Sequence, residues 1–552
     1  MRNFFLISLV LIFAFSLAAK EISYDNCTIE IASDEFLIDG TTIVPGDVIC
    51  LLAGEKEYLL LKDIQGTEEQ PITIINKGGA IIINTDHFYG IKFDNCKHII
   101  FSGGGEEGLQ YGIQVQGVSN GAGMSIDNMS TNIEVEFIEV AHTLLAGIYA
   151  KTEPYQGDCN NLITRDKFTM YNLSIHNCYL HDIIDEGFYI GSSKYTGQTI
   201  YQCNNIVVLP HVIEGVYIYN NTIERTGWDG IQVSSSPENC NIFENLISYD
   251  SQEEEYGQMS GILIGGGSKC DCYNNKIFDG KGDGIDVFGM GFMKIYNNLI
   301  VRAGRTYKPG TPTDFKSGIY VGYVANALSP NATFKLYNNT IISPKSFGIT
   351  YNNNEAAMGY AINNLITDPG YMNTVGNEAY INLMVNEDKV TQNNNFLSPD
   401  NATPKFIDFT NNDFDLKPNS QAVNYGTSLT SEGITFDIDN RFRPFHTYFD
   451  AGAYECHNSH AAIIENETVI GAPYPVPAKQ YIDIPINVNS NNNIEIVLTS
   501  LKGIIVLKKV FTKNQITNSK ISIDIINLPT GKYILSTKVD KVIINKPIII
   551  LR

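Results

Sequence analysis

The stretch VYIYNNTIERTGWDGIQ, residues 216–232, contains two short motifs that recur through the middle of the chain. The first, Tyr-Asn-Asn before an apolar segment, begins at Tyr219, Tyr273, Tyr296 and Tyr337. The second is Gly-Ile followed by one variable residue, and its copies begin at Gly90, Gly112, Gly147, Gly230, Gly261, Gly284, Gly318 and Gly348, with Gly187-Phe188 as a variant. In three of the four Tyr-Asn-Asn copies, the second Asn precedes a Gly-Ile by nine residues. A spacing this regular predicts one supersecondary unit that repeats along the chain.

The shortest interval between Gly-Ile copies, 22 residues, sets the expected length of the unit, and the longer intervals indicate insertions. The unit holds short segments rich in Ile, Val and Tyr, separated by Asn, Gly and Asp. It contains no amphipathic helix of about 10 to 15 residues, which excludes a barrel of alternating strands and helices. Leucine at the fixed offsets of leucine-rich repeats is also absent. The pattern therefore predicts a solenoid of short parallel strands, with corner Asn residues in left-handed backbone that pair their amides between coils.

This repeat resembles the right-handed parallel β-helix of pectate-lyase-like proteins over roughly residues 40–455. The resemblance implies an all-β fold class, a parallel β-helix solenoid followed by a small β-sandwich, and it does not fix an activity. Residues 450–455, Asp-Ala-Gly-Ala-Tyr-Glu, resemble the tail that ends many such β-helices.

The end of the chain has several landmarks of a second domain. They are Pro473-Tyr474-Pro475-Val476-Pro477, Leu501-Lys502-Gly503, Leu528-Pro529-Thr530-Gly531-Lys532-Tyr533 and the basic apolar segment from Lys546 to Arg552. In this order they resemble the C-terminal sorting domain of the type IX secretion system, although Val476 stands where that family usually has Asn. The resemblance implies the type IX machinery as a partner and a secreted or outer-membrane-attached protein. An ordinary accessory β-sandwich, such as a carbohydrate-binding domain, is the alternative.

The start of the chain has the features of an export signal. Arg2 precedes an uncharged apolar run over residues 4–17 and the small residues of Ser16-Leu17-Ala18-Ala19, where we expect cleavage. No later stretch approaches the roughly 20 apolar residues of a membrane span, so we predict no transmembrane segment. The predicted domains are residues 1–19 as signal peptide, 20–455 as β-helix, 456–466 as linker and 467–552 as sorting domain.

The composition limits the partners. There are 38 Lys and Arg against 60 Asp and Glu, and a net charge of −22 argues against a nucleic acid as partner. Ten cysteines in an exported chain permit disulfides, whose pairing the sequence does not fix. The spacing of Cys270 and Cys272 is not that of a zinc hook. Cys96, Cys178 and Cys240 each follow Asn in a strand-like segment, where we expect small buried thiols.

The register predicts a stripe of outward side chains. If the Ile of Gly-Ile points inward, the next residue points outward, because side chains alternate along a strand. These residues are Lys92, Gln114, Tyr149, Tyr189, Gln232, Leu263, Asp286, Tyr320 and Thr350. Tyrosine rings on such a stripe suit a polysaccharide that lies along the solenoid. The alternative is that Tyr is simply a favourable strand residue.

The residue before each glycine forms a second column: Tyr111, Ala146, Glu186, Asp229, Ser260, Asp283, Ser317 and Phe347. Glu186, Asp229 and Asp283 therefore fall on nearby coils. Glycoside hydrolysis needs one protonated and one ionised carboxyl group, and neighbouring carboxylates raise one another's pKa. Stacked carboxylates could instead bind Ca²⁺, the one cofactor that the sequence makes eligible. Asp-Gly is also a common turn dipeptide.

A third column, at the end of the next strand, holds Asp182, Arg225, Tyr249, Asp279, Arg302 and Ser343, with His181 beside Asp182. In a lyase, Arg225, His181 or Arg302 could remove the proton beside a uronate carboxylate. We predict a site on the coils from residue 181 to 305, in a protein that binds and degrades a polysaccharide by hydrolysis or elimination. The predicted catalytic residues are Glu186, Asp229, Asp283, His181 and Arg225. The predicted substrate-binding residues are Tyr149, Tyr189, Trp228, Gln232, Asp286, Tyr320 and Arg302.

The alternative function is a non-catalytic surface adhesin or structural solenoid that binds glycans or cations. It predicts that changes at Glu186 or Asp283 alter binding or stability without any turnover to lose.

Overall fold

A computed structural model describes part of the chain. The described residues are 27–308, 315–445, 447–457, 469–470, 473, 478, 481–487, 493–500, 505–516, 520–529, 531–539 and 542–550. The predicted signal peptide, most of the predicted linker and most of the proline-rich segment at 473–477 lie outside them. The described residues form two compact units, one within residues 24–459 and one within residues 460–552.

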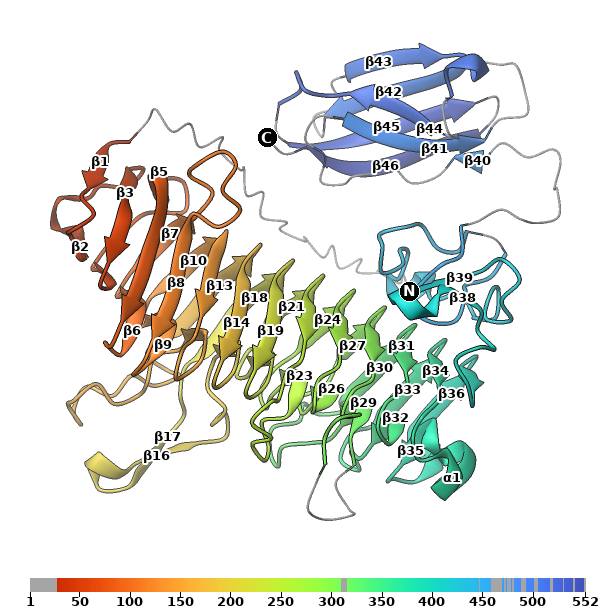
Figure 1. Cartoon of the computed structure of the whole chain (residues 1–552), viewed down its shortest axis with the longest axis horizontal. Helices are drawn as coiled ribbons and strands as arrows, with labels where there is room; N and C mark the ends of the chain where they lie inside the picture. Colours follow the sequence, from red (N-terminus) through yellow and green to blue (C-terminus); the bar gives the residue numbers. More distant parts are fainter. Residues whose placement is uncertain are drawn as a thin grey trace, which may run out of the picture. The chain divides into compact units, whose positions relative to one another are not determined.

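The first unit is a parallel β-helix with three strands in a regular coil (Figure 1). One coil consists of β18 (Val212–Tyr219), β19 (Thr222–Thr226) and β20 (Ile231–Val233), and each pairs in parallel with its counterparts on the neighbouring coils. We call the three resulting ladders face 1, face 2 and face 3. Faces 1 and 2 share a 23-stranded sheet, and face 3 is a separate 12-stranded sheet. The predicted all-β parallel solenoid is confirmed.

The strand bounds follow the repeat. Face 1 contains β1 (Ile29–Ile31), β3 (Val48–Lys56), β5 (Ile72–Thr85), β7 (Lys97–Ser102), β10 (Thr131–Glu136), β13 (Thr169–His176), β18, β21 (Glu238–Phe243), β24 (Cys270–Tyr273), β27 (Met293–Tyr296), β30 (Thr333–Tyr337), β33 (Met358–Ile362) and β36 (Val390–Asn393). Face 2 contains β8 (Ile113–Val118), β11 (Ile138–Ala141), β14 (Tyr179–Ile183), β19, β22 (Leu246–Ser248), β25 (Lys276–Phe278), β28 (Leu299–Val301), β31 (Thr340–Ile342), β34 (Leu365–Thr367) and β37 (Phe396–Ser398). Face 3 contains β2 (Leu37–Asp39), β4 (Leu59–Lys62), β6 (Tyr89–Asp94), β9 (Ala122–Asp127), β12 (Ile148–Ala150), β15 (Phe188–Ile190), β20, β23 (Ser260–Ile264), β26 (Asp283–Val287), β29 (Ser317–Val321), β32 (Phe347–Tyr351) and β35 (Ile381–Leu383).

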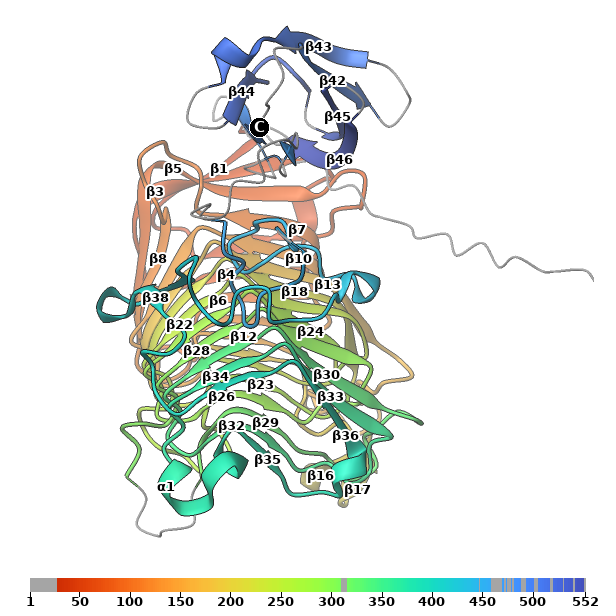
Figure 2. The same ribbon diagram turned by 90° about the vertical axis from the view of Figure 1, so that its right-hand side faces the viewer.

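Several elements lie outside the three faces. A hairpin of β16 (Gln198–Ile200) and β17 (Ile206–Val208) and the short helix α1 (Met372–Val375) lie on the side of the solenoid where the face 3 strands run (Figures 1 and 2). A second hairpin consists of β38 (Phe406–Asp408) and β39 (Asp413–Leu416).

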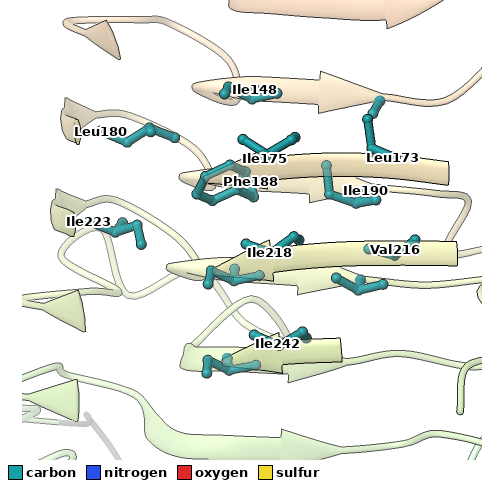
Figure 3. Close-up of a cluster of buried hydrophobic side chains, with 14 of the residues drawn as sticks. Ile148, Leu173, Ile175, Leu180, Phe188, Ile190, Val216, Ile218, Ile223 and Ile242 are labelled. Carbon is teal, nitrogen blue, oxygen red and sulfur yellow. The ribbon is translucent and has the colours of Figure 1, made fainter. Parts of the chain in front are cut away.

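The interior of the solenoid is a stack of aliphatic side chains. Each face contributes inward residues that meet their register partners on the next coil, as Ile231 does with Ile262. The side chains of this core are at most 9% exposed. Figure 3 shows part of the stack: Ile148, Leu173, Ile175, Leu180, Phe188, Ile190, Val216, Ile218, Ile223 and Ile242. Burial of this kind stabilises each coil only against its neighbours, which is the reason that the repeat must be stacked.

The recurring glycine is a position of close approach. At Gly284, an added Cβ would lie 2.4 Å from Cγ2 of Ile300 and 2.5 Å from the carbonyl oxygen of Gly318. The recurring glycine at the start of a face 3 strand, as at Gly284, therefore leaves no room for a side chain between this strand and the next coil.

The two asparagines of the Tyr-Asn-Asn motif have separate roles. The first, as in Asn220 and Asn274, adopts left-handed backbone with φ near 54° and 55°. The second is buried and stacks with its counterparts; the Asn221 side-chain amide donates to Oδ1 of Asn245 over 3.0 Å. The stack continues through Asn221, Asn245, Asn275, Asn298, Asn339, Asn364 and Asn395. The predicted amide pairing between coils is confirmed.

The prediction that Gln114 belongs to the outward stripe is wrong. Gly112-Ile113 begins β8, which pairs with β11 and with the second half of the long strand β5, from Ile81 to Thr85. Gln114 and Tyr111 therefore belong to face 2 and not to face 3. There Lys92 pairs with Ser125, and Ser125 pairs with Tyr149. A Gly-Ile dipeptide marks any tight entry into a strand, and only the pairing register shows to which face that strand belongs.

The structure also settles the cysteines of the solenoid. Disulfides join Cys27 to Cys50, Cys159 to Cys203 and Cys240 to Cys270. The prediction of buried thiols is confirmed for Cys96 and Cys178 and wrong for Cys240. Cys240 and Cys270 are register partners on neighbouring strands with Cα atoms 4.4 Å apart, which places their sulfurs within bonding distance.

The second unit is an antiparallel β structure. Its strands are β40 (Val469–Ile470), β41 (Tyr481–Asn487), β42 (Ile494–Ser500), β43 (Ile505–Phe511), β44 (Lys520–Asp524), β45 (Gly531–Val539) and β46 (Val542–Ile550). One sheet has the order β40-β41-β44 and the other β43-β42-β45-β46. Alternate residues such as Ile482, Ile496 and Leu535 form its own buried core.

Candidate functional site

The outward stripe and the glycine-preceding column face the same side of face 3. The Ser317 hydroxyl group, from the column, lies 2.8 Å from the Thr350 hydroxyl group, from the stripe on the next coil. Backbone bonds place Glu186 and Asp229 on adjacent coils, and Asp229 and Asp283 two coils apart with Ser260 between them. At about 4.8 Å per coil, these separations are about 5 and about 10 Å. We call this surface the face 3 site, defined by Tyr149, Lys151, Glu153, Glu186, Tyr189, Asp229, Gln232, Asp250, Asp283, Asp286, Lys316 and Tyr320.

Glu186 has the environment of a proton donor. Its side chain is 2% exposed and its Oε1 atom has no hydrogen-bond partner. Burial, with a smaller contribution from the charge of Asp185, raises the pKa of Glu186 to about 7, and Lys151 opposes this rise. A carboxyl group with such a pKa keeps its proton in about half of the molecules near neutral pH, which is the property that a general acid needs.

Tyr149 and Tyr189 are register partners on adjacent coils of face 3, and Tyr189 follows Glu186 by three residues. Their rings stack at 5.6 Å with an interplanar angle of 14°, and the Lys151 ammonium group lies 5.3 and 4.8 Å from their centroids. Lys151 also pairs with Glu153 at 2.7 Å, and the Tyr149 hydroxyl group donates to the same carboxylate over 3.0 Å. The Tyr189 hydroxyl group lies 3.1 Å from the Ser193 hydroxyl group, so both tyrosine hydroxyl groups have partners within the protein.

A buried group of carboxyl groups occupies the next coils. Asp229, Asp250, Asp283 and Asp286 are between 0% and 9% exposed, and a single cation, Lys316, lies 3.2 Å from Oδ2 of Asp283. Oδ1 of Asp229 accepts from the backbone and the hydroxyl group of Ser260, both over 2.7 Å. One oxygen atom each of Asp229, Asp250 and Asp286 has no hydrogen-bond partner.

The electrostatics of this group follow from its burial. Desolvation is the largest cause that raises the pKa of Asp229, Asp283 and Asp286, and it raises the pKa of Asp250 to about 7. The charges of neighbouring carboxylates add to the rise, among them that of Glu186 at Asp229. Protonation of such a group near neutral pH relieves the mutual repulsion of its members.

This burial predicts that stability falls as the pH rises. Asp250 has a pKa of about 7 in the folded protein against an ordinary 3.8. Its contribution to the free energy of unfolding is therefore fully present below about pH 4 and is lost as the pH rises to about 7. Asp250→Asn keeps the shape and cannot ionise, so its free energy of unfolding should exceed that of the wild type by a few kcal/mol near pH 7, at about 1.4 kcal/mol per pKa unit. Urea unfolding at about pH 4 and about pH 8 measures the difference. Equal pH dependence in the two chains would contradict a protonated Asp250.

The third column forms a separate ladder at the turn between faces 2 and 3. Its members Asp182, Arg225, Tyr249, Asp279, Arg302 and Ser343 all have positive φ. Arg225 makes a bidentate ion pair with Asp182 at 2.7 and 2.9 Å, and Arg302 does so with Asp279 at 2.5 and 2.8 Å. These two predicted site residues therefore bridge successive coils, with their guanidinium groups bound to the turn column.

His181 belongs to the same ladder. Its ring nitrogens lie 2.6 Å from Asp182 and 3.1 Å from Glu139, and its ring stacks on Tyr179 at 4.2 Å. The structure thus brings Glu186, Asp229 and Asp283 together on face 3 and groups His181, Arg225 and Arg302 elsewhere, around carboxylates of their own.

The other predicted residues lie on face 3 or next to it. Gln232 is 2% exposed and its Nε2 atom has no partner, while the Tyr320 hydroxyl group accepts from Asn352 over 2.9 Å. Trp228 precedes Asp229 and is half-buried. Lys151, Glu153, Asp250 and Lys316 are the residues of the face 3 site that sequence reasoning missed. The register offers a signal for Lys151 alone, because it stands two residues after the stripe residue Tyr149.

The described residues contain two groups in which three His, Asp or Glu side chains bring ligand atoms within 4.8 Å of one another. Neither group includes a member of the face 3 site. The carboxylates predicted as a Ca²⁺ site are therefore not gathered around one point in this arrangement.

Comparisons with known proteins agree with both units. Residues 211–397 match the family model described as "Right handed beta helix region", and residues 472–551 match "Secretion system C-terminal sorting domain". No curated protein matches the chain. In the described part of the chain, no helix has the length and apolar character needed to cross a membrane.

Three solved structures show likeness to the chain. The A-module of the Azotobacter vinelandii mannuronan C-5 epimerase AlgE6 is 14% identical, with 64% of this chain and 91% of that chain covered and a TM-score of 0.33. The A-module of AlgE4 from the same organism is 12% identical, with 64% and 88% covered and a TM-score of 0.32. XylC in complex with xylose is 11% identical, with 66% and 83% covered and a TM-score of 0.31.

The chain is thus a right-handed parallel β-helix protein with a type IX secretion sorting domain, and it is secreted or attached to the outer surface of the cell.

Proposed function

We propose that the protein binds and hydrolyses a polysaccharide on face 3, with Glu186 as the proton donor. The observation that carries the proposal is the Glu186 carboxyl group, which is buried, has an unpartnered oxygen atom and has a pKa raised to about 7. Asp229 lies one coil away, about 5 Å, and it too has an unpartnered oxygen atom. Neighbouring carboxyl groups raise one another's pKa, so one can stay protonated and protonate a leaving oxygen while the other acts as the ionised partner.

The charges of the site support an uncharged glycan as substrate. Elimination from a uronate requires cations that neutralise the sugar carboxylate. Among the described residues of the face 3 site the cations are Lys151 and Lys316, and both are already paired, with Glu153 and Asp283. Neither cation is left to bind a uronate carboxylate, so hydrolysis of a neutral polysaccharide fits these charges better than elimination.

A panel of polymers tests this proposal. The secreted chain is incubated with neutral glucans, xylans and mannans and, separately, with pectate and alginate, and two products are measured: new reducing ends and the absorbance of unsaturated uronate ends. We expect reducing ends from a neutral polymer without unsaturated product. Cleavage confined to the polyuronates, or an unsaturated product, would contradict it.

A second candidate function, binding without turnover, has its own support. Asp229 is 0% exposed and bonds to Ser260 on the next coil, so its carboxylate also stabilises the stack. Under this alternative, a glycan from the panel is retained by the immobilised protein, and prolonged incubation releases no product.

A further inference from the structure

A second group of ligating side chains lies on face 1, apart from the face 3 site. Glu134 and Glu136 stand two residues apart on β10, and His176 ends β13, the neighbouring strand. Glu136 is the register partner of His176. Ile133 and Val135 alternate with them along the strand and are buried in the core, so both carboxylates point outward. One ligand atom from each of the three side chains lies within 4.8 Å of the others.

Both carboxylates lie close to the imidazole ring of His176. Nε2 of His176 lies 3.1 Å from Oε1 of Glu134, and Nδ1 lies 3.8 Å from Oε2 of Glu136. Two ligands bound tetrahedrally at about 2.0 to 2.1 Å from one zinc ion would be about 3.3 Å apart. The two distances go to different ring nitrogens, and one ion binds only one of them. An ion at Nε2, beside Glu134, therefore requires the Glu136 carboxylate to turn away from Nδ1 toward it.

The imidazole is held in place before any ion binds. The His176 side chain is 6% exposed and stacks on the Tyr219 ring at 4.5 Å with an interplanar angle of 16°. Tyr219 begins a continuous stack with Phe243, Tyr273 and Tyr296 along face 1, at 4.8 to 5.0 Å between centroids. The side-chain amide of Asn177 lies 2.8 Å from Nδ1. A ligand whose orientation is fixed loses little entropy when it binds a metal.

We propose that Glu134, Glu136 and His176 form a binding site for a divalent transition metal ion of the Zn²⁺ type. One imidazole and two carboxylates are ligands that zinc accepts, whereas Ca²⁺ and Mg²⁺ prefer oxygen ligands throughout. The ion offsets the repulsion between two carboxylates on one side of a strand. It also joins β10 to β13, the two face 1 strands that flank the long excursion of the chain over residues 151–168. The site is independent of the proposed hydrolysis.

The second ligating group supplies a matched comparison. Glu57, Asp86 and His87 also bring ligand atoms within 4.8 Å, but the side chains of Glu57 and His87 are 52% and 42% exposed. Water competes for these ligands at every position, and the His87 ring is far less buried than that of His176.

The test is a titration of the untagged full chain with Zn²⁺ by calorimetry and with Co²⁺ by visible absorption. We expect one equivalent that binds tightly, with a Co²⁺ spectrum that indicates imidazole ligation. His176→Gln and Glu134→Gln should each weaken binding about tenfold or more, and His87→Gln should not. Zn²⁺ should raise the melting temperature of the wild type and of His87→Gln only. Thermal melts of the metal-free variants show whether they are folded. Unchanged titrations of both His176→Gln and Glu134→Gln would overturn the proposal.

Discussion

Replacing Glu186 with glutamine is expected to lower the turnover of a cleavable glycan by about 100-fold or more, with little change in KM. Glutamine has the shape of the protonated acid but has no proton to transfer to the leaving oxygen. We expect kcat to fall and KM to stay nearly constant because Glu186 supplies the proton, whereas substrate binding is assigned to other residues such as Tyr149 and Tyr189. The measurement is kcat and KM for the polymer identified by the panel, in the wild type and in Glu186→Gln.

The pH profile adds a second readout for the same residue. With a pKa of about 7, Glu186 loses its proton as the pH rises, so wild-type activity should decline above neutral pH. Glu214→Gln, on β18 of face 1, is the matched control and should keep the wild-type rate. If Glu186→Gln cleaved at the wild-type rate, Glu186 would not be the proton donor.

The largest loss of stability is expected from Asn298→Ala. The Asn298 side chain accepts from the backbone of Asn275 over 3.1 Å and from its amide over 3.0 Å. It donates to the carbonyl oxygen of Cys272 over 2.9 Å and to Oδ1 of Asn339 over 3.0 Å. Alanine leaves these partners buried and unsatisfied, which costs about 1 to 3 kcal/mol for each group. Chemical denaturation should show a loss of about 3 kcal/mol or more.

The control is Asn220, the first asparagine of the Tyr-Asn-Asn motif that begins at Tyr219. Asn220 is exposed and has a φ of 54°, so Asn220→Gly retains the left-handed turn and should change stability by much less. A similar loss for the two variants would show that the turn, and not the buried amide stack, accounts for the effect.

The repeat could be predicted from sequence because it follows from local constraints. A left-handed turn favours Asn, and a close approach between coils requires Gly. Both residues therefore recur at a regular spacing along the sequence. The same local character explains the failure at Gly112, where a Gly-Ile pair begins a face 2 strand. The disulfide between Cys240 and Cys270 likewise depends on which strands become neighbours.

The site was predictable to the extent that it lies on strands. Glu186, Asp229 and Asp283 could be placed in one column because each precedes a recurring glycine. Asp250 and Lys316 stand in turns of variable length, where no period assigns a direction. The partner of Arg225 could not be predicted because it lies on the neighbouring coil, where the guanidinium group reaches Asp182.

The bond between Cys240 and Cys270 has a mechanical consequence for a protein exposed outside the cell. A stack of coils held only by ladders of hydrogen bonds yields one coil at a time when it is pulled along its axis. This bond joins residues 30 positions apart on successive coils, so the chain between them cannot be drawn out straight. Unravelling from either end should therefore stall at this pair, and the segment between Cys240 and Cys270 should resist extension under tension.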